Sequence, residues 1–156
     1  MALNVGDKAP DFNGAIDENK NLSLKDLKGK WFVLYFYPKD NTSGCTKEAC
    51  SFRDNMEEIT KSGVEVIGVS PDSVKSHNNF KTKYNLNFHL IADPDKTICN
   101  AYDIMGEKSM YGKKYLGVIR TTYIIDDKGK IRKVFSNVKV DGHVEEVINA
   151  IKELKK

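Results

Sequence analysis

The sequence contains no apolar run that is long enough to cross a membrane. Its longest run, Trp31–Tyr37, is far shorter than the roughly 20 residues that a membrane-spanning helix needs. The first residues, Met1–Lys8, also lack the basic stretch followed by an apolar core that marks a secretory signal. We therefore expect a cytoplasmic protein that does not associate with membranes.

An excess of charge of one sign is also missing. The chain carries 25 lysines and arginines against 22 aspartates and glutamates, which gives a net charge of +3. Positive charge is spread along the sequence and forms only short doublets, such as Lys113-Lys114. Nucleic-acid-binding proteins concentrate basic residues in one patch or stripe, so we expect no nucleic-acid partner.

Cysteine is scarce, and only Cys45, Cys50 and Cys99 are present. Three cysteines do not build a disulfide framework, and in a reducing compartment they indicate redox or catalytic use. Cys45 and Cys50 lack the two-residue spacing of zinc knuckles, and none of the three histidines lies near them in sequence. We expect no metal ion and no other cofactor.

The chain length favours one structural unit. A chain of 156 residues with 40% hydrophobic content can bury most of its apolar surface around a single core. We found no internal repeat and no low-complexity stretch in it. We expect residues 1–156 to form a single domain.

The strongest structural signal is the uninterrupted apolar stretch Trp31–Tyr37. It is rich in aromatic and β-branched residues, which predicts a strand buried on both faces. Pro38 ends the strand, and a polar loop leads to a predicted helix, Cys45–Ser62, which Gly63 should stop. Val64–Val69 has a similar apolar density and is expected to be a parallel neighbour of the first strand.

The remaining patterns predict the other elements of the fold. In chain order they are an N-terminal hairpin (Ala9–Ile16 and Lys20–Leu24), a brief helical turn capped by Ser23, a surface helix (Val74–Tyr84), a short strand (His89–Ala92), a short helix (Lys96–Tyr102), a long irregular loop (Asp103–Gly117), a hairpin (Ile119–Asp126 and Lys130–Phe135) and a C-terminal helix (Val144–Leu154). This order is typical of a thioredoxin-like α/β fold, with a central mixed β-sheet flanked by helices and an N-terminal β-hairpin extension.

Cys45 falls in the first turn of the predicted helix. Unpaired N–H groups and the positive end of the helix dipole stabilise an anion there, so the position favours a nucleophilic thiolate. The alternative is that Cys45 and Cys50 are small apolar residues that fill gaps in the core. The polar residues before Cys45 argue against its full burial and favour the nucleophile.

The residues around Cys45 resemble a known family. Pro38-Lys-Asp-Asn-Thr42-Ser-Gly-Cys45 is similar to the P-x-x-x-T-x-x-C signature of peroxiredoxins, and Cys50, five residues later, resembles the bacterioferritin comigratory protein (BCP, Q-type) subfamily. The similarity covers essentially the whole chain, including Gly106–Ser109 and Arg120–Asp126. Ser43 departs from the pattern, because many members have proline there. Proline would restrict the loop.

The resemblance implies a thiol-dependent peroxidase that reduces hydrogen peroxide and alkyl hydroperoxides in antioxidant defence. Cys45 would be oxidised to sulfenic acid, Cys50 would resolve it as an intramolecular disulfide, and thioredoxin would reduce the disulfide. Arg120 would stabilise the thiolate and the peroxide, Thr42 would hydrogen-bond to either, and Pro38 would shield the site from water. We expect a monomer.

Three further expectations follow from the residues around this motif. Residues five apart on a helix are separated by about 7.5 Å of rise, which exceeds the reach of a disulfide, so a Cys45–Cys50 bond requires local unwinding. Glu48 would repel a thiolate and should therefore face a cation or hydroxyl, and Cys99 is expected to be a buried bystander. The alternatives are a thiol–disulfide oxidoreductase, which would normally carry the C-x-x-C pair that is absent here, or a redox-sensing protein on the same fold.

Overall fold

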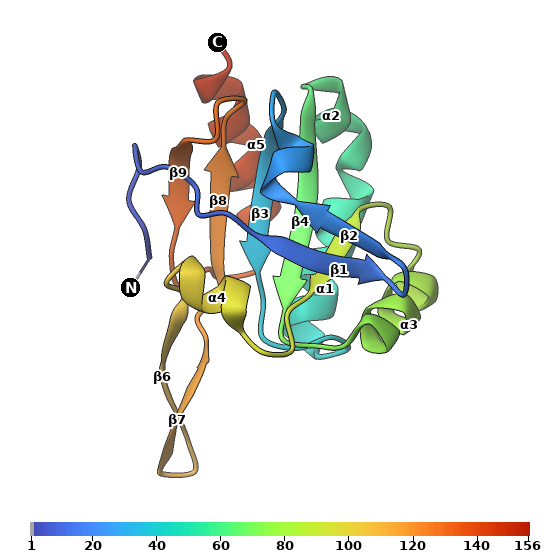
Figure 1. The fold of residues 1–156 in the computed structure, drawn as a ribbon, viewed down its shortest axis with the longest axis vertical. Coiled ribbons are helices and arrows are strands. Elements are labelled where there is room, and N and C mark those ends of the chain that lie inside the picture. Colours follow the sequence, from blue (N-terminus) through green and yellow to red (C-terminus); the bar gives the residue numbers. More distant parts are fainter. Residues whose placement is uncertain (1) are drawn as a thin grey trace.

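The computed structural model describes residues 2–156. A seven-stranded mixed sheet in the order β2-β1-β5-β4-β3-β8-β9 forms its centre, and β6 and β7 form a separate two-stranded sheet (Figure 1). The elements are β1 (Asn13–Asp17), β2 (Lys20–Ser23), the 3-10 helix η1 (Leu24–Leu27), β3 (Trp31–Phe36), α1 (Ser43–Asp54), α2 (Met56–Lys61), β4 (Val64–Ser70), α3 (Val74–Tyr84), β5 (His89–Ala92), α4 (Thr97–Ala101), β6 (Met105–Met110), β7 (Lys113–Val118), β8 (Thr121–Ile125), β9 (Ile131–Phe135) and α5 (His143–Leu154).

Strand β3 is the centre of the large sheet, as its apolar sequence predicts. It pairs in parallel with β4 and antiparallel with β8, and all its residues except Trp31 are buried. Gly68 of β4 lies opposite Tyr35. A Cβ atom at Gly68 would lie 2.9 Å from Cζ of Tyr35 and 2.8 Å from Cδ2 of Leu90, so only glycine fits beside these side chains.

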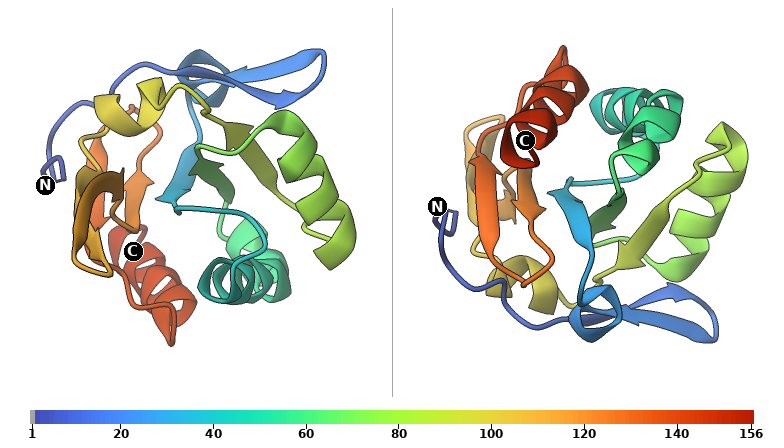
Figure 2. Two further views of the ribbon diagram at one scale, coloured as in Figure 1. Left: turned by 90° about the horizontal axis from the view of Figure 1, so that it is seen from below. Right: turned by 90° about the horizontal axis from the view of Figure 1, so that it is seen from above.

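Two apolar layers cover the two faces of the sheet. Figure 2 shows α1 and α5 side by side on one face and α4 on the opposite face. Because side chains alternate along β3, Tyr35 packs in the first layer and Phe36 in the second. The first layer also contains Cys45, Phe52, Phe80 and Val147, and the second contains Cys99, Tyr102 and Tyr123.

Most predicted elements are present with small changes in their ends. The N-terminal hairpin, helix Val74–Tyr84, strand His89–Ala92 and the hairpin of β8 and β9 are confirmed. Ser23 caps η1 as predicted, because its hydroxyl accepts a hydrogen bond from the Asp26 backbone N–H. No helix within residues 2–156 has the length and apolar character needed to span a membrane.

The helix after Cys45 differs from the prediction. It was expected to run unbroken from Cys45 to Ser62, but it begins at Ser43 and is interrupted at Asn55, between α1 and α2. The Asn55 side chain donates a hydrogen bond to the Ser51 carbonyl at 2.7 Å. Asparagine competes in this way for backbone groups, which explains why the helix is broken where the apolar pattern continues.

The segment Asp103–Gly117 was predicted to be an irregular loop, and this prediction is wrong. It contains the hairpin of β6 and β7, which projects from the body of the molecule (Figure 1). Tyr111 and Gly112 form its two-residue turn with φ values of 53° and 79°, as a type I′ turn requires. Most side chains of both strands are exposed or half-buried, so the sequence lacks the apolar alternation that identifies a strand.

Candidate active site

Cys45 is the third residue of α1, the helix that follows β3 in the chain. This confirms its predicted position in the first turn of a helix. Its predicted partial exposure is wrong, because Cys45 is only 1% exposed and packs in the apolar layer that contains Tyr35 and Ala49. Lys39 and residues 41–43 before Cys45 are exposed, but the helix turns the thiol inward.

Arg120 contacts Cys45 directly. It immediately precedes β8, whose Thr121 pairs with Phe36 at the end of β3, and this register brings Arg120 to the start of α1. Nη2 of Arg120 donates a hydrogen bond to Sγ of Cys45 at 3.3 Å. The same guanidinium donates from Nη1 to Oε1 of Glu48 at 2.6 Å. The predicted pair of Cys45 and Arg120 is therefore brought together, with Glu48 as a third member.

The charges around Arg120 determine its protonation. Burial acts to lower its pKa, but the negative charges of Glu48 and Cys45 and its hydrogen bonds to both outweigh this, so the pKa is raised. The guanidinium therefore stays positive throughout the accessible pH range. This permanent cation lies beside the buried Sγ atom of Cys45.

Glu48 is buried, although glutamate side chains usually lie at the surface. Its side chain has no exposed surface, and it faces the Arg120 cation, as predicted. Burial raises the pKa of Glu48 to about 7, although the positive charge of Arg120 acts in the opposite direction. Its second oxygen, Oε2, and the hydroxyl of Tyr35 are both buried without a hydrogen-bond partner. Arg120 therefore faces two groups, Cys45 and Glu48, that can each carry a negative charge.

Thr42 and Pro38 flank the site in the loop before α1. Thr42 is the N-cap residue of α1, and its hydroxyl donates a hydrogen bond to the Lys39 carbonyl at 2.9 Å. Its side chain is thus near the start of the helix but bonded to the loop and not to Cys45. Pro38 is half-buried and lies two residues after the end of β3.

Cys50 and Cys99 have different surroundings. Cys50 is half-buried and lies on α1 with Cys45, and all three cysteines are free thiols. Cys99 is fully buried in the second apolar layer, on the other side of the sheet from Cys45. Burial, with a hydrogen bond to Asp93 and its negative charge, raises the pKa of the Cys99 thiol far above its ordinary range. Cys99 is thus separated from Cys45 by the sheet and is not poised to form a thiolate.

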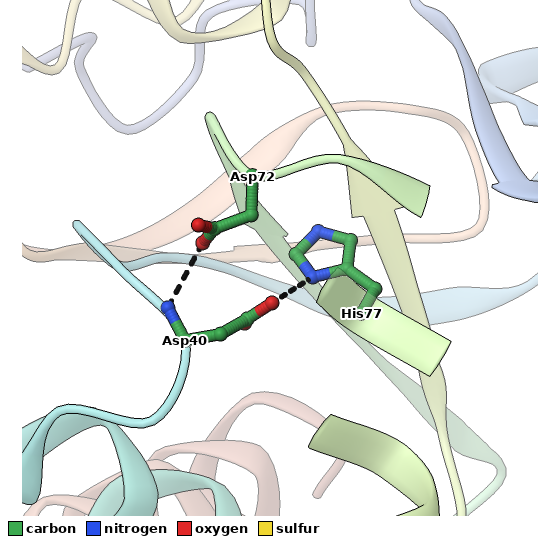
Figure 3. Close-up of side chains that lie close together, drawn as sticks. All are labelled: Asp40, Asp72 and His77. Atoms are coloured by element: carbon green, nitrogen blue, oxygen red, sulfur yellow. Dashed lines mark hydrogen bonds and ion pairs between the residues drawn. The ribbon is translucent and has the colours of Figure 1, made fainter. Parts of the chain in front are cut away.

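A second polar cluster was missed by the sequence reasoning. Asp40, which belongs to the loop before α1, and His77 of α3 are both buried and hydrogen-bonded to each other, and Asp72 lies beside them (Figure 3). Asp40 falls within the motif that ends at Cys45, and His77 lies one turn from the buried Phe80. A polar residue on the apolar face of a helix was the available signal.

Comparison with known proteins identifies the family. The family model described as AhpC/TSA matches residues 5–134. The chain belongs to the AhpC/TSA family. The putative peroxiredoxin bcp of Coxiella burnetii is 55% identical over 151 residues, which cover 97% of this chain and 100% of the relative. Peroxiredoxin Bcp of Bacillus subtilis is 44% identical, with 99% and 98% covered. These relatives confirm the resemblance to the BCP peroxiredoxins.

Solved structures support the same assignment. Peroxiredoxin Q of Xanthomonas campestris superimposes with a TM-score of 0.88 at 40% identity, covering 93% of this chain and 92% of that one. A mutant PrxQ of Xylella fastidiosa gives a TM-score of 0.94 at 36% identity, covering 100% and 99%. The predicted thioredoxin-like fold is confirmed. As a peroxiredoxin, the protein is a thiol peroxidase that acts on peroxides and requires a thiol reductant.

Proposed function

We propose that Cys45 is the nucleophile that reduces the peroxide. Its sulfur attacks one oxygen of the substrate, so that an S–O bond forms and the O–O bond breaks. Cys45 becomes a sulfenic acid, and the departing oxygen takes up a proton to leave as water or an alcohol. The contact between Arg120 and Sγ of Cys45 at 3.3 Å is the observation that carries this proposal.

Arg120 would stabilise the reaction by hydrogen bonding. A planar guanidinium offers several donors in fixed directions, so it can hold the thiolate while another N–H faces the incoming peroxide. Its bond to Glu48 at 2.6 Å fixes the plane of the group before substrate arrives. Donors that are already oriented toward developing negative charge lower the barrier without a cost of reorganisation.

Thr42 and Pro38 would complete the site. The Thr42 hydroxyl now donates to the Lys39 carbonyl at 2.9 Å, and rotation of this side chain would redirect it toward the substrate oxygen. Pro38 has no N–H to bind water and restricts the loop. Its half-buried ring would keep water from the site.

Cys50 would resolve the sulfenic acid as an intramolecular disulfide with Cys45. Both residues lie on α1 in the reduced protein, so the beginning of the helix must unwind before the two sulfurs can meet. Unwinding would expose the disulfide to an external reductant. We propose thioredoxin for this role, and a monomer of one domain as the active unit.

The substrates would be hydrogen peroxide and organic hydroperoxides. Alkyl peroxide reduction activity is attributed to the bacterioferritin comigratory protein of Xanthomonas campestris, whose structure is 39% identical to this chain. The chemistry at Cys45 needs only an accessible O–O bond and does not depend on a particular substituent. We propose that the protein works in antioxidant defence and redox homeostasis in the cytoplasm.

Three serine variants, compared in the same assay, test the proposed roles of the cysteines. Turnover is measured with hydrogen peroxide and with an alkyl hydroperoxide, in the presence of thioredoxin and its reductase. Cys45→Ser should lose all peroxide reduction, because the nucleophile is absent. Cys50→Ser should consume one equivalent of peroxide and then stop as the sulfenic acid. Cys99→Ser is the matched control and should keep most of the turnover.

Other outcomes would redirect the assignment. Residual turnover in Cys45→Ser above a few per cent would place the nucleophile elsewhere. A Cys99→Ser protein that stops as the sulfenic acid would make Cys99, and not Cys50, the resolving residue. Disulfide reduction without peroxide reduction in the unmodified protein would favour a thiol–disulfide oxidoreductase.

A further inference from the structure

The loop that leads into α1 and Cys45 is held at one buried residue, Asp40. Its side chain is 1% exposed. The Tyr37 hydroxyl donates to Oδ1 of Asp40 at 2.6 Å, and the Ser76 hydroxyl donates to Oδ2 at 2.8 Å. Nδ1 of His77 lies 2.7 Å from the same Oδ2 (Figure 3). Asp40 is thus tied to the end of β3 and to the first turns of α3.

The position of the proton on His77 follows from its partners. Nε2 lies 3.0 Å from the carbonyl oxygen of Ile91, which can only accept a hydrogen bond. Nε2 must therefore carry a hydrogen and donate it. The other nitrogen, Nδ1, faces Oδ2 of the Asp40 carboxyl group at 2.7 Å. His77 connects the loop to β5 through both of its nitrogens.

A second bond holds the Asp40 backbone. Its N–H donates to Oδ2 of Asp72 at 2.9 Å, and the Ser70 hydroxyl donates to the same oxygen at 2.6 Å. The residues that follow Asp40 in the loop are exposed to solvent. They are Asn41, with a φ of 61°, and Thr42. Asp40 is therefore the last anchored residue before the chain enters α1.

The ligand atoms of Asp40, Asp72 and His77 lie within 4.8 Å of one another, which is close enough for a metal ion. However, Nδ1 and Oδ2 are already joined by a short hydrogen bond. Hydroxyl hydrogens of Ser70 and Ser76 also face the carboxylate oxygens that a cation would need. The cluster is organised as a set of hydrogen bonds that fixes the loop.

We propose that Asp40 and His77 are positioning residues that set how readily the beginning of α1 opens. This inference rests on the proposed function of Cys45 and Cys50. A firm anchor at Asp40 keeps Cys45 beside Arg120 and delays the unwinding that Cys50 needs. A weakened anchor lets the helix open more often.

How often the beginning of α1 opens determines which of two reactions the sulfenic acid of Cys45 undergoes. In the first, the Cys50 thiolate attacks Sγ of Cys45, the S–S bond forms, the S–O bond breaks, and the departing hydroxide takes up a proton to leave as water. In the second, another peroxide transfers an oxygen atom to the same sulfur, which becomes a sulfinic acid while water or an alcohol is released. The first needs the opened helix, whereas the second needs the closed site around Arg120. The anchor should therefore control sensitivity to excess peroxide.

Two substitutions of His77 separate its two hydrogen bonds. His77→Asn places an amide N–H near the position of Nδ1, so the bond to Asp40 is kept and the bond to Ile91 is lost. His77→Gln places its amide near the position of Nε2, so the bond to Ile91 is kept and the anchor on Asp40 is lost. Ser76→Ala is a milder variant that removes one of the donors to Asp40.

A matched control accounts for the general loss of a buried hydrogen bond. Tyr102 donates from its hydroxyl to the Pro10 carbonyl at 2.7 Å, and it lies in the apolar layer on the other side of the sheet. Tyr102→Phe therefore removes one such bond without touching the loop. When Tyr102→Phe and the unmodified protein are compared under conditions where they have the same free energy of unfolding, their amide exchange and their oxidation of Cys45 should match.

Amide hydrogen exchange and mass spectrometry provide the two readouts. In the reduced state, His77→Gln should exchange the amides of residues 41–50 about tenfold faster than His77→Asn or Tyr102→Phe, as loss of a buried charged hydrogen bond implies. At high peroxide concentration, it should form about tenfold less sulfinic acid per turnover, because resolution becomes faster. Ser76→Ala should change both quantities in the same direction by a smaller factor.

The outcomes distinguish this inference from the proposed function. If the unmodified protein forms no Cys45–Cys50 disulfide, the proposed function fails, and the exchange comparison still tests the anchor. If the disulfide forms but His77→Gln and His77→Asn exchange and oxidise alike, the positioning role is overturned. Should both variants fail to fold, Ser76→Ala decides, and behaviour equal to that of Tyr102→Phe would overturn the inference.

Discussion

Arg120 makes two hydrogen bonds that a single ammonium cannot reproduce. Its two terminal nitrogens separately contact Cys45 and Glu48. Arg120→Lys keeps the positive charge but loses the planar pair of donors, so the rate constant for oxidation of Cys45 by peroxide should fall about 100-fold. Stopped-flow measurement of the first turnover isolates this step from the later reduction by a thiol reductant.

Arg132 supplies the control for Arg120. It lies on the edge strand β9 and pairs with Asp126 at 3.3 Å, and its guanidinium lies over the ring of Trp31. Arg132→Lys should therefore leave the reaction with peroxide unchanged. Equal rate constants for Arg120→Lys and the unmodified protein would place Arg120 outside the site.

Glu48 should make stability depend on pH. Its pKa rises from 4.5 to about 7 on folding, mainly because of burial. Between these values the folded protein keeps a proton on Glu48 that the unfolded chain releases, so raising the pH favours unfolding. The stabilising contribution is complete below about pH 4.5 and is lost as the pH rises through about 7.

Glu48→Gln removes this titration and retains a polar group of the same shape. The free energy of unfolding of the unmodified protein should fall relative to that of Glu48→Gln by about 1–3 kcal/mol between these two pH values. Urea titrations of both reduced proteins measure the difference, and groups common to both cancel. A difference that stays constant with pH would show that folding does not raise the pKa of Glu48.

The local sequence identifies the first residues of the site, but it does not identify the residues that pack around them. Cys45, Thr42 and Pro38 follow one another in a short motif, and the position of Arg120 follows from the family pattern. The burial of Glu48 and the bond between Asp40 and His77 depend on how α1, α3 and the sheet pack together. No spacing in the sequence brings Asp40 to a residue that lies 37 positions later.

At the scale of the element, the proposed mechanism requires α1 to adopt two arrangements of the same residues. The reduced helix separates Cys45 from Cys50, and the proposed disulfide needs them in contact. Oxidation should therefore raise amide exchange in residues 43–53 at least about tenfold, while β3 stays protected because it pairs on both sides within the sheet. Comparison of the oxidised and reduced proteins by mass spectrometry measures this.

Ser43 provides a control for the opening of α1. It is the first residue of the helix, a position where proline is well accommodated because its missing N–H is not needed. Ser43→Pro should stabilise the beginning of α1 and reduce the exchange of the oxidised form. Equal protection of the reduced and oxidised proteins would mean that the disulfide joins another pair of cysteines.

The prediction of elements succeeded where one face or both faces of the element are buried. β3 and β4 were identified from their apolar density, and α5 from its apolar stripe. The β6–β7 hairpin was missed because neither of its faces is packed along most of its length. Its turn, formed by Tyr111 and Gly112, also lacks the Asn-Gly pair that usually identifies a two-residue hairpin.

At the scale of the whole molecule, the β6–β7 hairpin stands apart from the two apolar layers. Met110 is 57% exposed and Tyr111 is 98% exposed, so its outer half buries little surface. Replacing Ser109–Lys114 with Asn-Gly keeps the pairing of Lys108 with Tyr115. The free energy of unfolding should change by less than about 1 kcal/mol.

Urea denaturation measures this change, and a core substitution calibrates it. Ile124→Val removes one methylene group from the fully buried centre of β8 and should cost about 1 kcal/mol. A shortened hairpin that loses clearly more stability than Ile124→Val would show that the projection is part of the cooperative core.

The projecting hairpin also has a consequence for the behaviour of concentrated solutions. In the described chain β6 and β7 pair only with each other, so each presents an open backbone edge, and apolar side chains such as Leu116 are exposed beside it. Such an edge invites strand addition from another molecule, and lysine is the residue that most often discourages it. Lys108, Lys113 and Lys114 place positive charge along this edge. We therefore expect the hairpin, which adds little to the stability of the fold, to limit self-association of the protein in concentrated solution.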